Sequence, residues 1–387
     1  MREIDRLITN LTTGYNTEVR PPENNSEVLY VNCSFFIMSI KDYDDISGVL
    51  SVTGGVMMRW QDPRLTWNPA DFSDIDNVLV KRSKIWTPDL YVINPANNFG
   101  SLGDDKYLVR FFSSGLSTLG IGDDIKTLCP SDMAYFPFDV QSCSVRVAPW
   151  TYFSTEIRLL PMLNTIDLTY FSPNNMWDID STSAERFGLS AEYNGMVSFT
   201  VRLRRKPLYF VISMMAPIFL LALLNPFVFL LPVESGERIS FSVTIFLSFA
   251  VFMTLLSDNL PKSSTPLPII CYFLFTAIVY SGLITIFTML LMRLHHADSN
   301  VKAPKWLRGI VYVFSFRCLE RVGRTKRTTD VVQISEKHGS QFLKEGNWKR
   351  ESRVEIARKL DKLLFIYSII VDCLMILCMI LILSGAP

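Results

Sequence analysis

Histidine is scarce in this chain of 387 residues, with three copies at positions 295, 296 and 338. The first 206 residues contain none, which excludes His-based catalysis and a histidine-ligated metal site from that part of the chain. The sequence also lacks the GxGxxG, P-loop, CxxC and GxSxG patterns that mark many nucleotide-binding, redox and hydrolytic sites. These absences predict a protein that is not an enzyme and that holds no metal ion and no cofactor.

Charge is scarce as well, because charged residues make up 19% of the chain and hydrophobic residues 49%. Four stretches carry almost no charge, at residues 207–233, 239–257, 263–292 and 363–387. Since about 20 apolar residues cross the hydrocarbon of a membrane as a helix, we predict four membrane spans. Asp372 is the one charge inside them. A charge at that depth is costly, so we expect Asp372 to meet Asn225 of the first span or to be protonated.

The charges that remain are unevenly distributed. Residues 1–206 hold 19 Lys and Arg against 25 Asp and Glu, a net of −6, whereas residues 293–362 hold 17 against 8, a net of +9. The positive-inside rule then predicts a multi-pass plasma-membrane protein with a cytoplasmic segment at 293–359 and both termini outside. Glycosylation sequons at Asn10, Asn24 and Asn32 fit an extracellular first part. No signal peptide precedes Arg2, so we interpret the chain as a mature or engineered sequence.

Short alternating segments fill most of residues 20–206, and helical periodicity is confined to the first 20. The clearest segment is 197–204, where Val197, Phe199, Val201 and Leu203 share one face. Thr53-Gly-Gly55 and Asn94-Pro95 read as turns between strands. The expected fold class is a membrane α+β protein. An extracellular β-sandwich at 1–206 precedes a four-helix transmembrane bundle, made of 207–292, with a pore-lining helix at 238–257, and 360–387.

Cysteine is present in an odd number, seven. Four of them lie in the spans or the cytoplasmic segment, which leaves Cys33, Cys129 and Cys143 outside. Cys129 and Cys143 enclose 13 residues that include Tyr135-Phe-Pro-Phe-Asp139. A disulfide there would hold an aromatic loop compact and contribute about 3 kcal/mol. Cys33 is then either a buried thiol or an intermolecular link.

A polar stripe runs along the second span. Its residues are spaced alternately three and four apart, which places them on one face of a helix: Glu237, Ser240, Thr244, Leu247, Val251, Thr254 and Asp258. A ring of such helices would enclose water that hydrates these polar side chains. In a lone membrane helix the same side chains would face lipid, which is unfavourable. The alternative is a polar seam packed against neighbouring spans.

Several motifs lie at characteristic places along the chain. They are the Cys129–Cys143 loop with Phe136-Pro-Phe-Asp139, Trp60-x-Asp62-x-Arg64-Leu65-x-Trp67, Trp86-Thr-Pro-Asp89, Arg205-Lys-Pro-Leu-Tyr-Phe210 and Leu230-Leu-Pro-Val-Glu-Ser-Gly-Glu-Arg-Ile-Ser240. In them the sequence resembles the Cys-loop pentameric ligand-gated ion channels of the cation-selective nicotinic and serotonin type 3-like branch. The resemblance implies a homo- or heteropentamer, an agonist site between neighbouring sandwiches and a pore lined by the second span.

In such a pentamer, acidic rings at Glu234, Glu237 and Asp258 would attract cations, and apolar rings at Leu247 and Val251 would close the pore. We therefore predict a ligand-gated cation channel subunit. Its partners would be four further subunits, a small-molecule agonist, permeant cations and membrane lipid, but no nucleic acid. Two alternatives stay open, a non-gating accessory subunit of a heteromeric channel and an anion-selective member. Anion-conducting relatives carry Pro-Ala where this chain has Gly236-Glu237, which favours cations.

The resemblance also places an agonist site. Its contacts would be Tyr91, Trp150, Tyr152, Phe187 and Tyr193, with Met57 on the complementary face. Aromatic faces of this kind attract an ammonium group, so a cationic agonist suits them. However, Ser190-Ala191 stand where nicotinic agonist-binding subunits carry vicinal cysteines, and Ile93 replaces an expected tyrosine. These departures argue against acetylcholine and γ-aminobutyrate and leave open another amine or a different small molecule.

Coupling between the two parts of the chain is the last expectation from the resemblance. Asp45 would pair with Arg205 just before the first span, and Phe136, Pro137 and Phe138 would rest on the loop around Pro261. The alternative is a set of solvated turn charges.

Overall fold

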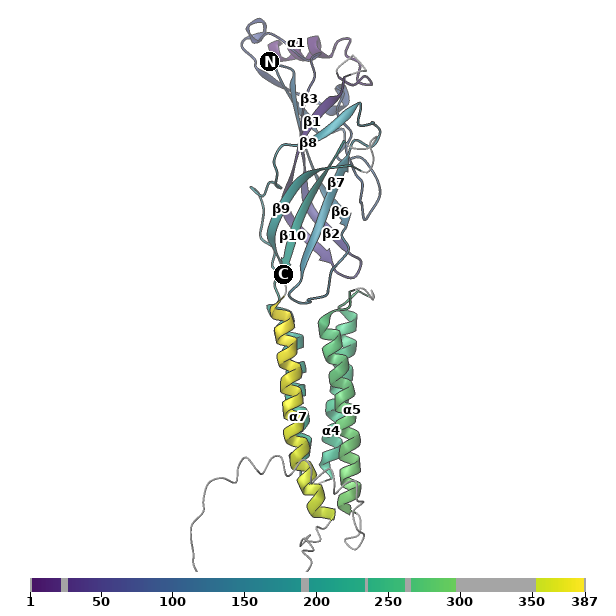
Figure 1. Ribbon diagram of the computed structural model, residues 1–387. Coiled ribbons are helices and arrows are strands. Elements are labelled where there is room, and N and C mark those ends of the chain that lie inside the picture. Colours follow the sequence, from purple (N-terminus) through teal and green to yellow (C-terminus); the bar gives the residue numbers. More distant parts are fainter. Residues whose placement is uncertain are drawn as a thin grey trace, which may run out of the picture. The chain divides into compact units, whose positions relative to one another are not determined.

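The computed structural model describes residues 2–21, 27–188, 195–233, 236–261, 266–296 and 353–385 (Figure 1). The chain divides into two compact units. The first comprises Met1–Tyr209 with Asn259–Pro268, and the second comprises Phe210–Asp258 with Ile269–Gly385.

The first unit is a sandwich of two sheets that follows a short helix, α1 (Arg2–Thr12). One sheet has six strands in the order β3-β5-β6-β2-β1-β8 and the other has four in the order β4-β7-β10-β9. Their bounds are β1 (Leu29–Asp44), β2 (Val49–Gln61), β3 (Asn77–Lys81), β4 (Tyr91–Val92), β5 (Leu108–Phe112), β6 (Leu116–Leu128), β7 (Val140–Ala148), β8 (Ile157–Pro161), β9 (Trp177–Phe187) and β10 (Met196–Arg205). Short 3-10 turns, η1 (Pro69–Phe72) and η2 (Arg82–Lys84), flank β3.

Alternating side chains bring the two sheets together. In β10 the apolar members at positions 197, 199, 201 and 203 are buried, while Arg202 and Arg204 are exposed. The ring of Phe199 stacks on that of Phe35 from β1, with centroids 5.4 Å apart, so the core lies between the sheets. The predicted β-sandwich is therefore confirmed, and its period-2 pattern is the physical reason for it.

The expected disulfide joins Cys129, directly after β6, to Cys143 in β7, with Cα atoms 5.1 Å apart. Because β6 and β7 belong to different sheets, this bond ties the two sheets to each other. Cys33 lies in the core with no exposed surface, and burial raises the pKa of its thiol to about 12. Of the two interpretations of Cys33, the structure matches the buried thiol.

The turn expected at Thr53-Gly-Gly55 is wrong. Gly54 and Gly55 form no turn; they lie inside β2 and pair with β1 on one side and β6 on the other. A Cβ atom on Gly55 would lie 1.9 Å from the carbonyl oxygen of Ile121, and one on Gly54 would lie 2.3 Å from that of Phe36. The glycines are needed because the backbones of three strands approach closely here. Close approach of another backbone is a common reason for glycine inside a strand.

The second unit is a bundle that contains four helices long and apolar enough to span a membrane: Leu208–Leu230, Glu237–Asp258, Ile269–His295 and Ile356–Ser384. The first is a composite of α2 (Leu208–Phe210), the π-turn η3 (Val211–Met215), α3 (Ala216–Leu224) and the 3-10 turn η4 (Asn225–Leu230). The other three are α4 (Glu237–Asp258), α5 (Ile269–His296) and α7 (Arg353–Ser384). In Figure 1, α4, α5 and α7 run lengthwise beside one another.

Asp372 of α7 is buried, with 1% of its surface exposed, but it does not pair with Asn225 as expected. Its Oδ2 atom has no hydrogen-bond partner among the described residues. Asn225 instead accepts a hydrogen bond from Ser281 of α5 at 3.4 Å. The expectation rested on depth in the membrane alone, and depth does not say which face of a helix a residue occupies.

We expect Gly55→Ala to destabilise the first unit, because its methyl group has to displace backbone of β6. Overpacking of this kind costs about 1–3 kcal/mol. Thermal unfolding of the detergent-purified chain measures the loss. The control is Gly100→Ala, since a Cβ atom there meets nothing within 4 Å. Equal midpoints for the two variants would contradict the close-approach explanation.

Candidate functional site

The polar stripe of α4 lies on an open face of the bundle. All seven of its residues are exposed, and the apolar pair Leu247 and Val251 keep 60% and 50% of their surface. The residues of α4 that are buried occupy the opposite face: Arg238, Ser242, Ile245, Phe249 and Leu256. The stripe is therefore not a seam packed against neighbouring spans of the same chain. Glu234, the other predicted acid, lies outside the described residues.

The hydroxyl groups on this open face are oriented by the helix itself. Thr244 donates its proton to the carbonyl of Ser240 at 2.8 Å, and Thr254 donates to that of Val251 at 2.7 Å. A hydroxyl that donates to its own helix keeps its oxygen lone pairs for another partner. The exposed face thus offers water or cations a row of oxygen acceptors with a carboxylate at each end, Glu237 and Asp258.

The buried face of α4 is held against α5 by both apolar and polar contacts. Phe249 is fully buried, and Ser242 hydrogen-bonds Thr285 of α5 at 2.7 Å. Because a buried hydroxyl pair without its partner is costly, this bond fixes the rotation of α4 about its own axis. That rotation decides which residues form the open face.

A second candidate site is a group of aromatic rings on the four-stranded sheet. Tyr91 of β4 stacks on Phe99, with centroids 5.2 Å apart, and Phe99 meets Trp150 edge-on at 5.1 Å. Trp150 follows β7 and is 51% exposed, and Phe99 is 47% exposed. Exposed aromatic rings in mutual contact form a wall suited to a planar or cationic ligand.

The other predicted ligand contacts are placed differently. Tyr152 turns partly toward the core, where its hydroxyl accepts a hydrogen bond from the Trp86 indole at 3.3 Å. The guanidinium of Arg146 covers the ring of Phe187, 4.7 Å from its centroid. Met57 belongs to β2, in the other sheet of the sandwich. Tyr193 lies outside the described residues.

The described residues of one chain supply only a wall of this aromatic site. The hollow beside Trp150, whose lining includes Tyr152, Ser154 and Met196, has a volume of about 10 Å³. Ligand pockets usually measure some 300–1,000 Å³. An enclosed site at Trp150 would therefore need further walls beyond the residues that the structure describes.

A third group surrounds Arg205 at the end of β10. Its guanidinium pairs with Asp45 at 2.8 Å, as the sequence analysis expected, and also with Asp139 at 2.8 Å. The rings of Trp177 and Phe136 lie 4.2 Å and 5.2 Å from it. The side chain of Arg205 is 1% exposed, so these are not solvated turn charges.

Burial and charge act in opposite directions on this group. Burial raises the pKa of Asp45 above its usual range, although the hydrogen bond and charge of Arg205 oppose this. Burial tends to lower the pKa of Arg205, but the hydrogen bonds and charges of Asp139 and Asp45 outweigh it and raise that pKa. The arginine therefore keeps its charge and depends on two carboxylates for it.

The aromatic loop between the two cysteines is mostly turned inward. Phe136 and Pro137 are buried, and Phe138 is half-buried, as is Pro261.

Among the sequons, Asn10 lies exposed on α1 and Asn32 exposed on β1, whereas Asn24 is outside the described residues.

Phe99 and Asp139 were not predicted as site residues. Asp139 could have been found, since it ends the Phe136-Pro-Phe-Asp139 motif and a carboxylate there needs a partner. Phe99 lies in an asparagine-rich loop without periodicity, and only the contact with Trp150 reveals it. The sequence carried no signal for that contact.

Comparison with known families gives two matches that follow the two units. A family model described as the neurotransmitter-gated ion-channel ligand binding domain matches residues 4–207. A second, described as the neurotransmitter-gated ion-channel transmembrane region, matches residues 214–356.

Curated relatives agree with these matches. The chain is 30% identical to the neuronal acetylcholine receptor subunit alpha-2 of Homo sapiens over 311 residues, which cover 79% of this chain and 58% of that protein. It is 30% identical to the Gallus gallus subunit alpha-2 over 81% of this chain and 60% of the relative. It is 27% identical to the Homo sapiens subunit alpha-6 over 79% and 63%. The chain thus spans about three fifths of the length of these relatives.

We expect the two partners of Arg205 to differ in their effect on stability. Asp139 is 2% exposed and Asp45 is 17% exposed, and breaking a buried pair costs about 3–5 kcal/mol. Asp139→Asn should therefore lower the thermal midpoint of the purified chain more than Asp45→Asn. Asp180→Asn, which breaks the surface pair with Arg204, is the control with a small expected change. Equal losses for Asp139 and Asp180 would contradict this ranking.

Proposed function

The chain belongs to the neurotransmitter-gated ion-channel family, and we propose that it is one subunit of a pentameric cation channel that an extracellular small molecule opens. The observation that carries the proposal is the open polar face of α4. A membrane helix that packs its apolar face inside its own chain and leaves hydroxyls and carboxylates uncovered needs water on that side. Five copies around an axis supply it.

In this ring, the α4 stripe forms successive layers along the pore. Hydroxyl oxygens of Ser240, Thr244 and Thr254 replace part of the hydration of a passing ion. The layers of Leu247 and Val251 are wide apolar girdles that close the pore by expelling water. Gating then consists of a change in the radius of these girdles.

Cation selectivity follows from the acids at the two ends of the stripe. Rings of Glu237 and Glu234 at one mouth and of Asp258 at the other raise the local concentration of cations and repel anions. An anion-selective channel is disfavoured because Gly236-Glu237 stand at the start of α4, where anion-conducting relatives carry Pro-Ala. A non-gating accessory role is disfavoured because the stripe has no interruption.

The agonist site lies between neighbouring subunits. Tyr91, Phe99 and Trp150 form the wall on one subunit, and the β2 face with Met57 forms the wall on the next. The relatives are named acetylcholine receptor subunits, which fits a ligand with an ammonium group. Arg146 already covers one face of Phe187, so the cation of the ligand settles on Trp150 and Phe99.

The membrane orientation follows from charge. The first unit is extracellular, the basic segment 293–359 is cytoplasmic, and both termini lie outside the plasma membrane. Arg205 stands at the end of β10, where the chain enters the first span, and its ion pairs with Asp45 and Asp139 transmit agonist binding to the pore. Phe138 and Pro261 take part on the membrane side of the same route.

Charge reversal at the mouth of the pore tests cation selectivity. In cells that express the chain, we expect Glu237→Lys to move the reversal potential of agonist currents away from the sodium potential and toward the chloride potential. Measurement in a sodium chloride gradient across excised patches gives the shift. Glu18→Lys makes the same charge change on the exposed surface of the first unit and should leave the reversal potential unaltered. An unshifted Glu237→Lys channel would place the selectivity filter elsewhere.

Truncation of Phe99 tests the aromatic wall. A screen of amines, including acetylcholine and choline, first identifies an agonist of the wild-type chain. We then expect Phe99→Ala to raise its half-maximal concentration roughly five- to tenfold, since an aromatic contact is worth about 1 kcal/mol or more. Phe99→Tyr should retain most of the sensitivity. Tyr170→Ala removes a ring that is 72% exposed elsewhere and serves as the control. Sensitivity that survives loss of the Phe99 ring would remove this residue from the site.

A further inference from the structure

Arg238 is a fully buried arginine in the first turn of α4. Its two terminal nitrogens bind the two carboxylate oxygens of Asp361 in α7, one of them at 3.2 Å. The ring of Phe229 in η4 lies 5.6 Å from the guanidinium carbon. The next residue back along the chain is Glu237, the first acid of the polar stripe. A permanent positive charge thus lies one residue from the mouth of the proposed pore.

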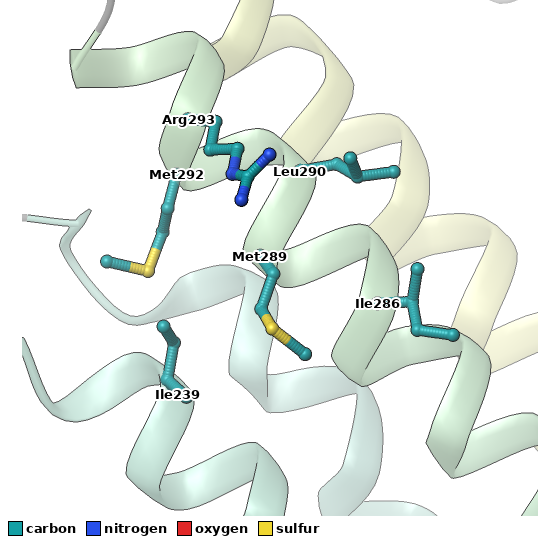
Figure 2. Close-up of a pocket in the computed structure, with 6 residues that line it drawn as sticks. All are labelled: Ile239, Ile286, Met289, Leu290, Met292 and Arg293. Carbon is teal, nitrogen blue, oxygen red and sulfur yellow. The ribbon is translucent and has the colours of Figure 1, made fainter.

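A second arginine at the same end of the bundle behaves differently. Arg293 of α5 is exposed and lines an open groove with Ile239 and Met289, as Figure 2 shows. Its charge therefore has direct access to solvent. Arg238 instead lies on the buried face of α4, and Asp361 compensates its charge. The partner comes from 123 residues further along the chain.

We propose that Asp361 is a positioning residue for ion conduction, which holds and neutralises Arg238 so that its positive charge does not reach the pore mouth. This inference rests on the proposed function, because it requires α4 to line the pore. A pentamer would contain five copies of the Arg238 guanidinium group, each in the same helical turn as the Glu237 ring. With each one paired, these five guanidinium groups add no net positive charge beside the Glu237 ring.

The chemistry of arginine makes the partner necessary. A guanidinium does not lose its proton in a protein, so without Asp361 its charge stays. A buried charge without a partner is costly, and the side chain turns toward the nearest water or remains as an uncompensated positive potential. Either outcome opposes the attraction that Glu237 exerts on cations. The fourth span, which is remote from the stripe, thereby influences conduction.

Single-channel recording of the full chain tests the proposal. We expect Asp361→Asn to lower the cation conductance roughly two- to fivefold, because each unpaired charge acts on the mouth at short range. The double variant Arg238→Gln with Asp361→Asn has no charge to position and should regain the wild-type conductance. Asp361→Glu keeps the pair and should also conduct normally.

Asp372→Asn is the matched control. It makes the same change in the same helix at a buried acid that has no hydrogen bond to an arginine among the described residues. A purely structural role of Asp361 would reduce the number of channels but leave the conductance of each one unchanged. Wild-type conductance in Asp361→Asn channels would therefore overturn the proposal, as would an equal loss in Asp372→Asn.

If the Asp361→Asn chain does not assemble by itself, it is co-expressed with the wild-type chain. Channels that contain an epitope-tagged variant subunit should then show conductance levels below the wild-type level. Tagged channels with wild-type conductance overturn the proposal, and so does a tagged chain that never joins the wild type, since the pair then serves assembly. A wild-type chain that gives no current under any agonist contradicts the proposed function instead, which separates the two failures.

Discussion

The central constraint in this structure is that α4 has one face that its own chain does not cover. Its buried residues lie on one side, and on the other lie the carboxylates of Glu237 and Asp258 and the hydroxyls of Ser240, Thr244 and Thr254. Hydrocarbon cannot satisfy those groups, so the face requires water or an identical partner. Under the proposed function, the pentamer and the conduction path both depend on this asymmetry.

Two polar contacts hold that asymmetry in place. The bond between Ser242 and Thr285 sets the rotation of α4 against α5, and the pair of Arg238 and Asp361 anchors its first turn to α7. Both lie on the side away from the stripe. Buried polar pairs contribute less to net stability than to the choice of one arrangement among several, which is the role required of a helix that presents one particular face.

Spacing in the sequence predicted features that depend on local periodicity, the family resemblance supplied the distant pair of Asp45 and Arg205, and other distant contacts were missed. Spacing alone located the α4 stripe and the β10 strand, because each is written in consecutive turns or alternate residues. Gly54 and Gly55 gave a wrong prediction of a turn, because glycine occurs both in turns and where strands approach closely. The roles of Phe99 and Asp361 are visible only from a neighbour elsewhere in the fold. Their roles depend on contacts in the folded structure, and a single sequence does not predict those contacts.

The open aromatic wall at Trp150 has a consequence for assembly. A hollow of about 10 Å³ is no binding site by itself, so under the proposed function affinity for agonist arises only when a second subunit closes over the rings. Ligand and neighbour then stabilise one another by mass action. Agonist binding therefore strengthens the association of neighbouring protomers, and an isolated protomer does not bind the agonist that the complete ring binds.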